Sequence, residues 1–180
     1  MRHPSQVLFA GEKPFPMLPA VDHYAGSERL ISKALQLQGE IGPIFDLTCD
    51  CEDGAVAGAD REHAAMVARI IMSEGNRHDR IGARIHDIRH PAWQQDIEII
   101  VGNAGQRLAF LTLPKVGGVD DVQQQLRVVQ RVTASAGLER TIPLHVLIET
   151  HTALREVWQI AALPEVESLD FGLMDFVSAH

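Results

Sequence analysis

Residues 43–56 read PIFDLTCDCEDGAV, an apolar-rich run that ends in a group of carboxylates. The beginning of this stretch has the composition of a buried strand, and Asp50, Glu52 and Asp53 follow it closely. Like charges at such spacing repel one another unless a cation or a substrate offsets them. The stretch therefore indicates a strand whose carboxyl end lies where a cation or a substrate binds.

The same alternation of short strands and longer helices continues along the whole chain. Strands are predicted at residues 6–10, 43–48, 80–86, 108–113, 144–150 and 168–173. Helices are predicted between them at residues 26–38, 60–74, 91–102, 119–136 and 152–163. Strands that alternate with helices of this length are typical of βαβ units and a parallel sheet. No low-complexity linker interrupts the pattern, so residues 1–180 are interpreted as one domain.

Polar side chains gather toward the carboxyl ends of several predicted strands. Alternate positions place Asp46, Thr48, Asp50 and Glu52 on one face of the second strand. A doubly wound sheet buries both faces and prefers apolar residues on both, whereas a TIM barrel builds its active site at the carboxyl ends of its strands. We therefore predict an α/β fold of the (β/α)8 TIM-barrel type.

The chain has too few predicted strands to close such a barrel, which needs eight. We expect it to cover only about the first six β/α units, and the native protein to continue by about 70 to 150 residues. Strands at the two open edges would then be templates for association. This predicts an oligomeric or aggregation-prone chain, with a homo-oligomer as the expected assembly.

Composition excludes several classes of partner. The formal net charge is −8 and no run of lysines and arginines occurs, so nucleic acids and anionic membranes are poor partners. The N-terminus lacks the apolar core of a signal peptide, and no apolar span of about 20 residues is present. A cytoplasmic protein is therefore expected. Cys49 and Cys51 are expected to be buried, reduced thiols.

Five motifs in order resemble the HpcH/HpaI aldolase and citrate lyase β-subunit (CitE-like) superfamily. DCEDGAV is similar to its acidic motif at strand two, ARIHD to Arg-Ile-Asn at strand three, and LTLPKV to Leu-Pro-Lys at strand four. VLIET is similar to Ile-Glu-Thr at strand five, and DFGLMDF to Gly-x-x-Asp-Leu at strand six. The resemblance covers essentially the whole chain and is closest to the CoA-ester lyase branch, which includes malyl-CoA and citramalyl-CoA lyases.

The resemblance implies a carbon–carbon lyase with Mg²⁺, or Mn²⁺, as its cofactor. The substrate would be a 3-hydroxyacyl-CoA, with coenzyme A as part of it, cleaved by retro-aldol or Claisen chemistry. One alternative is a metal-dependent aldolase that acts on free 2-keto acids such as pyruvate. A second is a non-catalytic partner subunit or a truncation product. The chain departs from the family at FAGEKP in place of its strand-one motif, at His86 in place of asparagine, and after VLIET, where the common glycine is missing.

The resemblance assigns Glu149 and Asp175 as the metal pair, with Glu149 also close to the substrate. Two carboxylates suit Mg²⁺, which prefers oxygen ligands and keeps several waters. The alternative is that they cap the following helices, because aspartate is a common N-cap. Arg84 is expected to hold a carboxylate or enolate oxygen of the substrate. Its alternative role is a structural ion pair with the acids of residues 50–53.

The remaining candidates are three acids and two lysines. Asp50, Glu52 and Asp53 are expected to hold Arg84, to orient metal-bound water or to move a proton, and the pattern does not decide which of them does so. Lys13 and Lys115 are candidate ligands for the phosphates of CoA, or serve local charge balance. A Schiff-base role for Lys115 is disfavoured because it follows Pro114 at the end of a strand.

Two histidines share the face of Glu149, so a zinc site was considered. His145 and His151 would lie about 20 Å apart along a strand. A single ion does not reach both without a bend in the chain. They are interpreted as core histidines or as support for the site.

Overall fold

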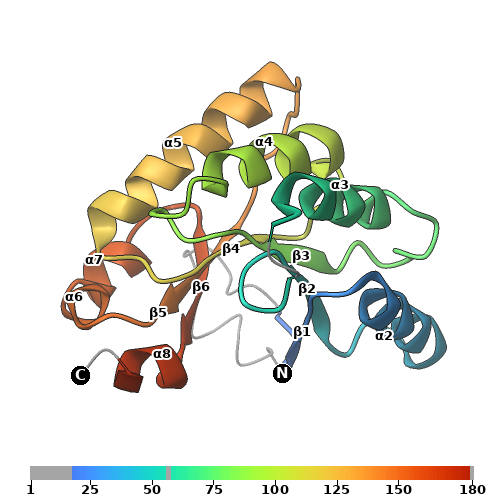
Figure 1. The fold of residues 1–180 in the computed structure, drawn as a ribbon, viewed down its shortest axis with the longest axis horizontal. Coiled ribbons are helices and arrows are strands. Elements are labelled where there is room, and N and C mark those ends of the chain that lie inside the picture. Colours follow the sequence, from blue (N-terminus) through green and yellow to red (C-terminus); the bar gives the residue numbers. More distant parts are fainter. Residues whose placement is uncertain (1–17, 56–57, 179–180) are drawn as a thin grey trace, which may run out of the picture.

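The computed structural model describes residues 18–55 and 58–178, and it has an α/β fold built on one parallel sheet (Figure 1). Six strands lie in the order β1-β2-β3-β4-β5-β6, and all neighbours pair in parallel. Their bounds are β1 Asp22–Ala25, β2 Asp46–Asp50, β3 Ile81–Arg84, β4 Leu111–Leu113, β5 Leu144–Ile148 and β6 Val166–Phe171. Sequential parallel pairing of this kind is that of a partial TIM barrel, as predicted.

Helices follow the strands and cover the outer face of the curved sheet. Their bounds are α2 Glu28–Ile41, α3 Asp60–Ile71, α4 Trp93–Ala104, α5 Val119–Ser135, α6 His151–Arg155, α7 Val157–Ala161 and α8 Leu173–Ser178. Figure 1 shows α2 to α5 as an arc along one side of the sheet, from blue through yellow. Among residues 18–55 and 58–178, no helix has both the length and the apolar character needed to span a membrane.

The hydrophobic core lies between this outer face and the helices. Isoleucine, leucine and valine side chains from β2 to β5 pack there against α3, α4 and α5. Cys49 and Cys51 belong to this layer as free, buried cysteines, which confirms the prediction. Burial raises the pKa of both thiols, which keeps them protonated.

The opposite, inner face of the sheet is polar. Asp46 accepts hydrogen bonds from Arg80 Nε and Nη2 at 2.6 and 2.7 Å. The ring of Phe110 stacks on His145 with 3.8 Å between centroids. Gly82 leaves room for Phe110, because a Cβ at Gly82 would overlap that ring. The inner face is therefore filled by specific pairs, and it supports the polar groups at the strand ends.

Three observed features depart from what the sequence predicted. The predicted strand at residues 6–10 lies outside the described residues, and the pattern missed β1, whose sequence DHYA is short and half polar. The predicted helix 152–163 is divided at Glu156, which has a non-helical φ of −102° and ψ of 13°. The carboxylate of Glu156 accepts the backbone N–H of Val119 at the start of α5 at 2.8 Å, which holds the break in place.

The third difference is the end of the last strand, and it changes the position of Asp175, a candidate metal ligand. The predicted strand 168–173 ends earlier, at Phe171, and α8 begins at Leu173. Asp175 was expected on the inward face of a strand, but it lies in the first turn of α8. Gly172 makes the change of direction, and its N–H still donates to Ile148 of β5 at 3.2 Å.

Candidate active site at the carboxyl ends of the strands

Arg84 and Asp50 form the centre of the site because of the register between two strands. In the β2–β3 pairing Asp50 lies opposite Arg84. Arg84 Nε and Nη2 donate to the two carboxylate oxygens of Asp50, each at 2.7 Å. The same oxygens accept the backbone N–H groups of Glu52 at 3.0 Å and Gly54 at 2.8 Å. The bidentate edge of Arg84 is thus occupied by Asp50, which is the ion-pair alternative raised for Arg84.

These contacts keep Asp50 ionised. Burial alone would raise the pKa of the Asp50 carboxyl, but Arg84 and the two backbone donors lower it below its usual value. Burial likewise would lower the pKa of Arg84, and its acidic neighbours raise it instead. The guanidinium is permanently charged and held in one orientation.

Glu52 lies between two cations. One carboxylate oxygen lies 3.0 Å from Arg84 Nη1 and the other lies 2.8 Å from Lys115 Nζ. Burial raises the pKa of Glu52, and the contacts with Lys115 and Arg84 only partly oppose this. Burial therefore raises the pKa of Glu52, whereas Arg84 and two backbone donors lower that of Asp50.

Lys115 connects the ends of several strands. It follows β4 in the left-handed region with φ of 50°, and its backbone N–H donates to Glu149 Oε2 at 2.9 Å. Its ammonium lies 3.3 Å from Asp53 and 4.0 Å from Asp175. Burial would lower the pKa of Lys115, but the contacts with Glu52 and Asp53 raise it. Lys115 is therefore a charged ammonium surrounded by acids.

Glu149 and Asp175 approach each other from β5 and α8. Glu149 directly follows β5, is only 4% exposed, and has one oxygen bound to the Lys115 N–H. Burial raises the pKa of Glu149, and the charges of Asp175 and Glu52 add to this effect. The side chain of Asp175 is 42% exposed. A Cβ at Gly172 would overlap the Glu149 carboxylate, so glycine is needed for this approach.

Together these side chains form what we call the strand-end cluster. Its members are Asp50, Glu52, Asp53, Arg84, Lys115, Glu149 and Asp175. Two cations therefore face five carboxylates, which leaves a formal charge of −3. A divalent cation at the Glu149–Asp175 end would offset most of this excess, and carboxylate oxygens are suitable ligands for Mg²⁺. The residues present fit such an ion.

A cavity of about 430 Å³ opens on the inner face beside this cluster. Its lining residues are Asp22, Tyr24, Arg84, Leu147, Glu149, Asp170 and Phe171. The guanidinium carbon of Arg84 lies 5.3 Å from the centroid of the Tyr24 ring, a cation–π contact. Sequence reasoning missed Tyr24 and Asp22 because both lie on β1, the strand that the pattern did not predict.

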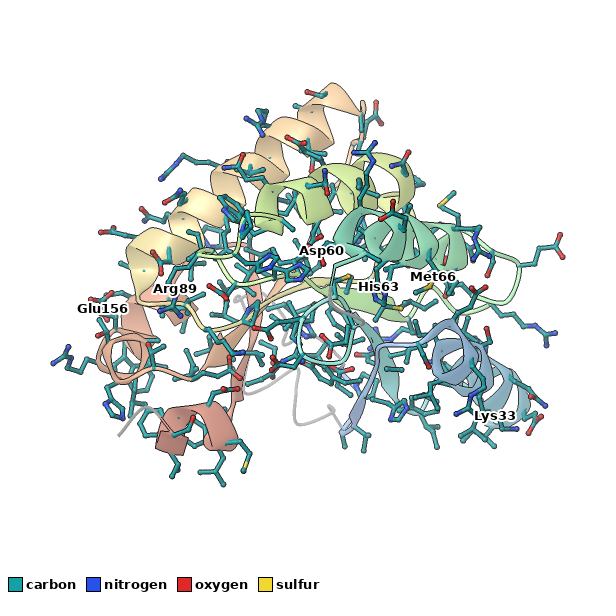
Figure 2. All side chains as sticks on the ribbon, viewed as in Figure 1. Lys33, Asp60, His63, Met66, Arg89 and Glu156 are labelled. Carbon is teal, nitrogen blue, oxygen red and sulfur yellow. The ribbon has the colours of Figure 1, made fainter. Side chains whose placement is uncertain are left out.

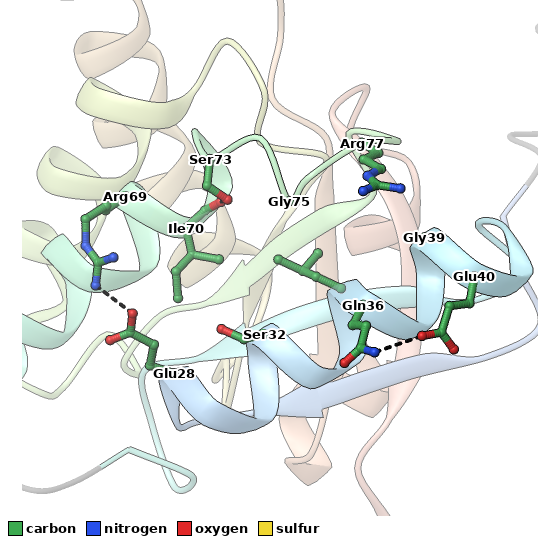
Figure 3. A pocket seen from close by; sticks show the side chains of 11 residues that line it. Glu28, Ser32, Gln36, Gly39, Glu40, Arg69, Ile70, Ser73, Gly75 and Arg77 are labelled. Carbon is green, nitrogen blue, oxygen red and sulfur yellow. Dashed lines mark hydrogen bonds and ion pairs between the residues drawn. The ribbon is translucent and has the colours of Figure 1, made fainter.

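A second, larger groove lies on the outside of the sheet between α2 and the end of α3 (Figure 3). Its volume is about 570 Å³. Figure 3 shows two pairs of side chains in contact there: Arg69 pairs with Glu28 at 2.9 Å, and Gln36 donates to Glu40 at 2.8 Å. None of the strand-end cluster lines it, so we place no chemistry there.

The remaining predicted candidates are Lys13 and the two histidines. Lys13 lies outside the described residues. His145 stacks on Phe110 and contacts Glu167 at 3.3 Å, and His151 opens α6. Within the part of the chain that the structure describes, the only group of three or more potential metal ligands with converging donor atoms is Asp60, His86 and His90. Among the described residues, the donor atoms of His145, Glu149 and His151 do not converge in this way.

Comparison with known proteins identifies the family of the chain and agrees with its fold. The family model described as HpcH/HpaI aldolase/citrate lyase matches residues 45–179. An L-malyl-CoA/beta-methylmalyl-CoA lyase of Rhodobacter capsulatus is 28% identical over 137 residues, which are 74% of this chain and 42% of that protein.

Two solved structures extend the comparison. A citrate lyase from Burkholderia xenovorans LB400 superposes with a TM-score of 0.88 and 47% identity, over 92% of this chain and 52% of the other. Protein CitE from Mycobacterium tuberculosis, solved with magnesium and acetoacetate, has a TM-score of 0.65 at 15% identity and covers 90% of this chain and 57% of its own. The chain thus spans about half the length of the proteins it matches.

Proposed function

Because the chain belongs to the HpcH/HpaI aldolase/citrate lyase family, we propose that it forms the catalytic half of a Mg²⁺-dependent CoA-ester lyase. The substrate class is a 3-hydroxyacyl-CoA, which is cleaved at the carbon–carbon bond next to the hydroxyl-bearing carbon. The observation that carries the proposal is the strand-end cluster, with a fixed guanidinium and an excess of carboxylates beside the same cavity.

Glu149 and Asp175 are the residues that would hold the metal ion. When bound there, Mg²⁺ or Mn²⁺ would polarise substrate oxygens and make the substrate hydroxyl more acidic. One oxygen of Glu149 is bound to the Lys115 N–H, which orients the carboxylate and leaves its other oxygen for an ion. This support from a backbone donor is the kind that fixes metal ligands in position.

The reaction moves one proton and one electron pair. The hydroxyl loses its proton, the carbon–carbon bond breaks, and the electron pair passes to the thioester as an enolate, which is then protonated on carbon. Arg84 stabilises the enolate oxygen through N–H groups that bind neither Asp50 nor Glu52, an electrostatic contribution of the type that is often large in enzymes. Asp50 is a positioning residue for Arg84, and Glu52 is the acid placed to hold or transfer the proton.

Lys115 has a supporting role in this proposal. Its ammonium contacts Glu52, Asp53 and Asp175, which favours local charge balance over binding of CoA phosphates. Acyl-CoA or a related small molecule is the expected partner, in a cytoplasmic protein. The acyl group is left to experiment.

The proposal is tested by incubating the chain with malyl-CoA and with citramalyl-CoA, with Mg²⁺ or with EDTA. Acyl-CoA and keto-acid products are measured by liquid chromatography and mass spectrometry. Cleavage should require Mg²⁺ and fall at least about 100-fold in Glu149→Gln, because removal of a metal ligand removes the charge stabilisation that the ion supplies. Glu98→Gln is the matched control, since Glu98 lies in an exposed ion pair with Arg131.

Four results would contradict the proposal. Cleavage that is unchanged by EDTA, or by Glu149→Gln, would remove the metal role. Turnover of free 2-keto acid aldols without any turnover of CoA esters would favour the pyruvate-aldolase alternative, and Mg²⁺-independent binding of CoA esters without turnover would favour a non-catalytic subunit.

A further inference from the structure

A second group of metal-binding side chains lies outside the strand-end cluster. Asp60 opens α3, whereas His86 and His90 belong to the loop between β3 and α4. One ligand atom from each of the three lies within 4.8 Å of the other two. Figure 2 labels Asp60, His63 and Met66 in order along α3, with Asp60 nearest the centre of the molecule.

The ring of His86 is oriented by a buried carboxylate. Its Nδ1 lies 2.7 Å from Asp96 Oδ2, and its backbone N–H donates to the same oxygen at 2.9 Å. Because that oxygen already accepts a backbone N–H, it acts as an acceptor for His86 Nδ1–H as well. The Nε2 atom is then left with its lone pair, and it lies 4.0 Å from Asp60 Oδ1.

Asp96 supplies the buried support that such a histidine needs. Its side chain is fully buried in α4, with an exposed fraction of 0%. A carboxylate that accepts the second ring N–H of a histidine fixes the tautomer and the ring orientation, and it strengthens metal binding through the other nitrogen. A fully buried carboxylate directed at a histidine is not explained by the chemistry proposed for the strand-end cluster.

The side chains of His90 and Asp60 are accessible enough to move toward a bound ion. Both are only partly buried. The His90 ring stacks on His86 with 4.0 Å between centroids, and its Nδ1 accepts one hydrogen bond, from the Ala92 N–H at 3.2 Å. Binding of an ion would tilt the two rings out of this stack and exchange the Ala92 hydrogen bond for a bond to the metal.

We propose that Asp60, His86 and His90 form a transition-metal site for Zn²⁺ or a similar borderline divalent ion. Two imidazole nitrogens and one carboxylate oxygen are a ligand set that zinc accepts, with water in the fourth position. Mg²⁺ and Ca²⁺ prefer all-oxygen sites, so they do not compete effectively here. The site is chemically distinct from the proposed Mg²⁺ pair Glu149 and Asp175.

The position of this site suggests what a bound ion would do. It would join the start of α3, which follows the loop that carries Glu52 and Asp53, to the loop that begins just after Arg84. The ion would therefore act as a structural clamp behind the strand-end cluster. Its affinity is measurable without any turnover, so failure of this site and failure of the lyase proposal are distinguishable.

The test is a titration of the metal-free chain with Co²⁺, which has visible absorption bands, followed by displacement with Zn²⁺. We expect one Co²⁺ per chain at this site, displaced by Zn²⁺ and retained in a large excess of Mg²⁺. Asp60→Asn and His90→Ala should each weaken binding at least about tenfold, and Asp96→Asn about 10- to 100-fold through the His86 orientation. Asp60 and His90 are partly exposed, so Asp60→Asn and His90→Ala avoid a substitution at the buried His86. Circular dichroism checks that each variant, including Asp96→Asn, is folded.

Two controls separate this site from other histidine sites and from the Mg²⁺ pair. His63→Gln removes a histidine one turn further along α3, whose Nε2 contacts the Asp50 carbonyl at 2.9 Å. Glu149→Gln removes the proposed Mg²⁺ ligand. Both variants should bind Co²⁺ as the wild type does. The proposal is overturned if folded His90→Ala keeps the wild-type spectrum and affinity, if His63→Gln or Glu149→Gln abolishes the bands, or if excess Mg²⁺ displaces the Co²⁺.

Discussion

The most consequential single residue is Arg84, whose guanidinium is fixed by Asp50 before any substrate arrives. Arg84→Lys keeps the charge but replaces two hydrogen bonds from a planar fork with one ammonium contact. We expect about 1–3 kcal/mol lower stability, because hydrogen bonds to charged groups at a largely buried position are lost. Cleavage should fall at least about 100-fold, since an oxyanion donor is displaced.

Arg69→Lys is the matched control, because Arg69 pairs with Glu28 and the two side chains are 64% and 54% exposed. An exposed pair contributes little, so its stability should change by no more than about 0.5 kcal/mol. Urea unfolding and the cleavage assay measure both variants. Equal stability losses in the two would show that the Arg84–Asp50 pair is not the structural centre described here.

The buried carboxyl of Asp22 is expected to make the stability of the protein depend on pH. Burial raises the pKa of Asp22 to about 6, and the Thr48 hydroxyl, which donates to both of its oxygens at 2.8 and 2.9 Å, only partly opposes this. Between the ordinary pKa and about 6 the folded state therefore binds more protons than the unfolded state. The stability that this extra proton binding at Asp22 gives the folded state is therefore present at low pH, and it is lost as the pH rises through that window.

Asp22→Asn should remove this loss, since an amide oxygen still accepts the Thr48 hydroxyl and carries no charge. The variant should be roughly 1–3 kcal/mol more stable than the wild type at pH 7, with the difference vanishing near pH 4. Unfolding by urea across pH 4 to 8 measures the difference curve. A variant that is less stable at pH 7 would show that the Asp22 charge is favourable in the fold.

At the scale of elements, Thr150 joins β5 to the loop after β4. Its hydroxyl accepts the Ala153 N–H at 3.0 Å as the N-cap of α6 and donates to the Val116 carbonyl at 2.8 Å. Thr150→Val keeps the shape and removes both bonds, so we expect a loss of about 1–2 kcal/mol. Thermal or urea unfolding measures this loss.

Ser27→Ala provides the comparison within the same type of element. Ser27 caps α2 with a single, longer hydrogen bond of 3.4 Å at an exposed position. Ser27→Ala should lower the free energy of unfolding by about half as much as Thr150→Val, or less. The reverse order of the two losses would mean that the bond to Val116 does not hold the two loops together.

The strands and helices also show how much of the fold could be predicted from the sequence. The four strands that end at or just before Asp50, Arg84, Lys115 and Glu149 were predicted to within two or three residues at their ends. Because the carboxyl ends of parallel strands meet at one edge of the sheet, this was sufficient to predict that these side chains gather there. β1 could not be predicted, since DHYA has neither the length nor the apolar alternation of a strand. Asp175 was misplaced because Gly172 ends the strand and starts a helix, which the motif alone does not reveal.

Other properties of the site depend on contacts between side chains from separate segments, which tertiary packing brings together. That the fork of Arg84 is occupied by Asp50 follows from the register between β2 and β3. The group of Asp60, His86 and His90 comes from two separate segments, and only the packing of α3 against α4 brings them together with Asp96. In the sequence His86 was noted only as a departure from asparagine in a motif.

At the scale of the whole molecule, the two edges of the sheet carry exposed apolar side chains. On the β1 side these are Val21, Leu30, Leu37, Ile41 and Ile44, and on the β6 side they are Phe171, Leu173, Met174 and Val177. Among the described residues, β1 and β6 each pair with one neighbour only. A contiguous apolar patch is a site of association, and an open strand edge is a template for pairing.

The chain should therefore associate in solution, and association should depend on these edges. Leu37→Glu combined with Ile44→Glu places charge on the β1-side groove, which has a volume of about 370 Å³ and is lined by both residues. We expect the wild type to elute as an oligomer or a broad aggregate in size-exclusion chromatography with light scattering, and the double variant to shift toward smaller species. Met72→Glu is the control, because Met72 is 45% exposed at the end of α3, away from both edges. A wild type that is a monodisperse monomer at every concentration, or an equal shift in the control, would show that the exposed edges do not drive association.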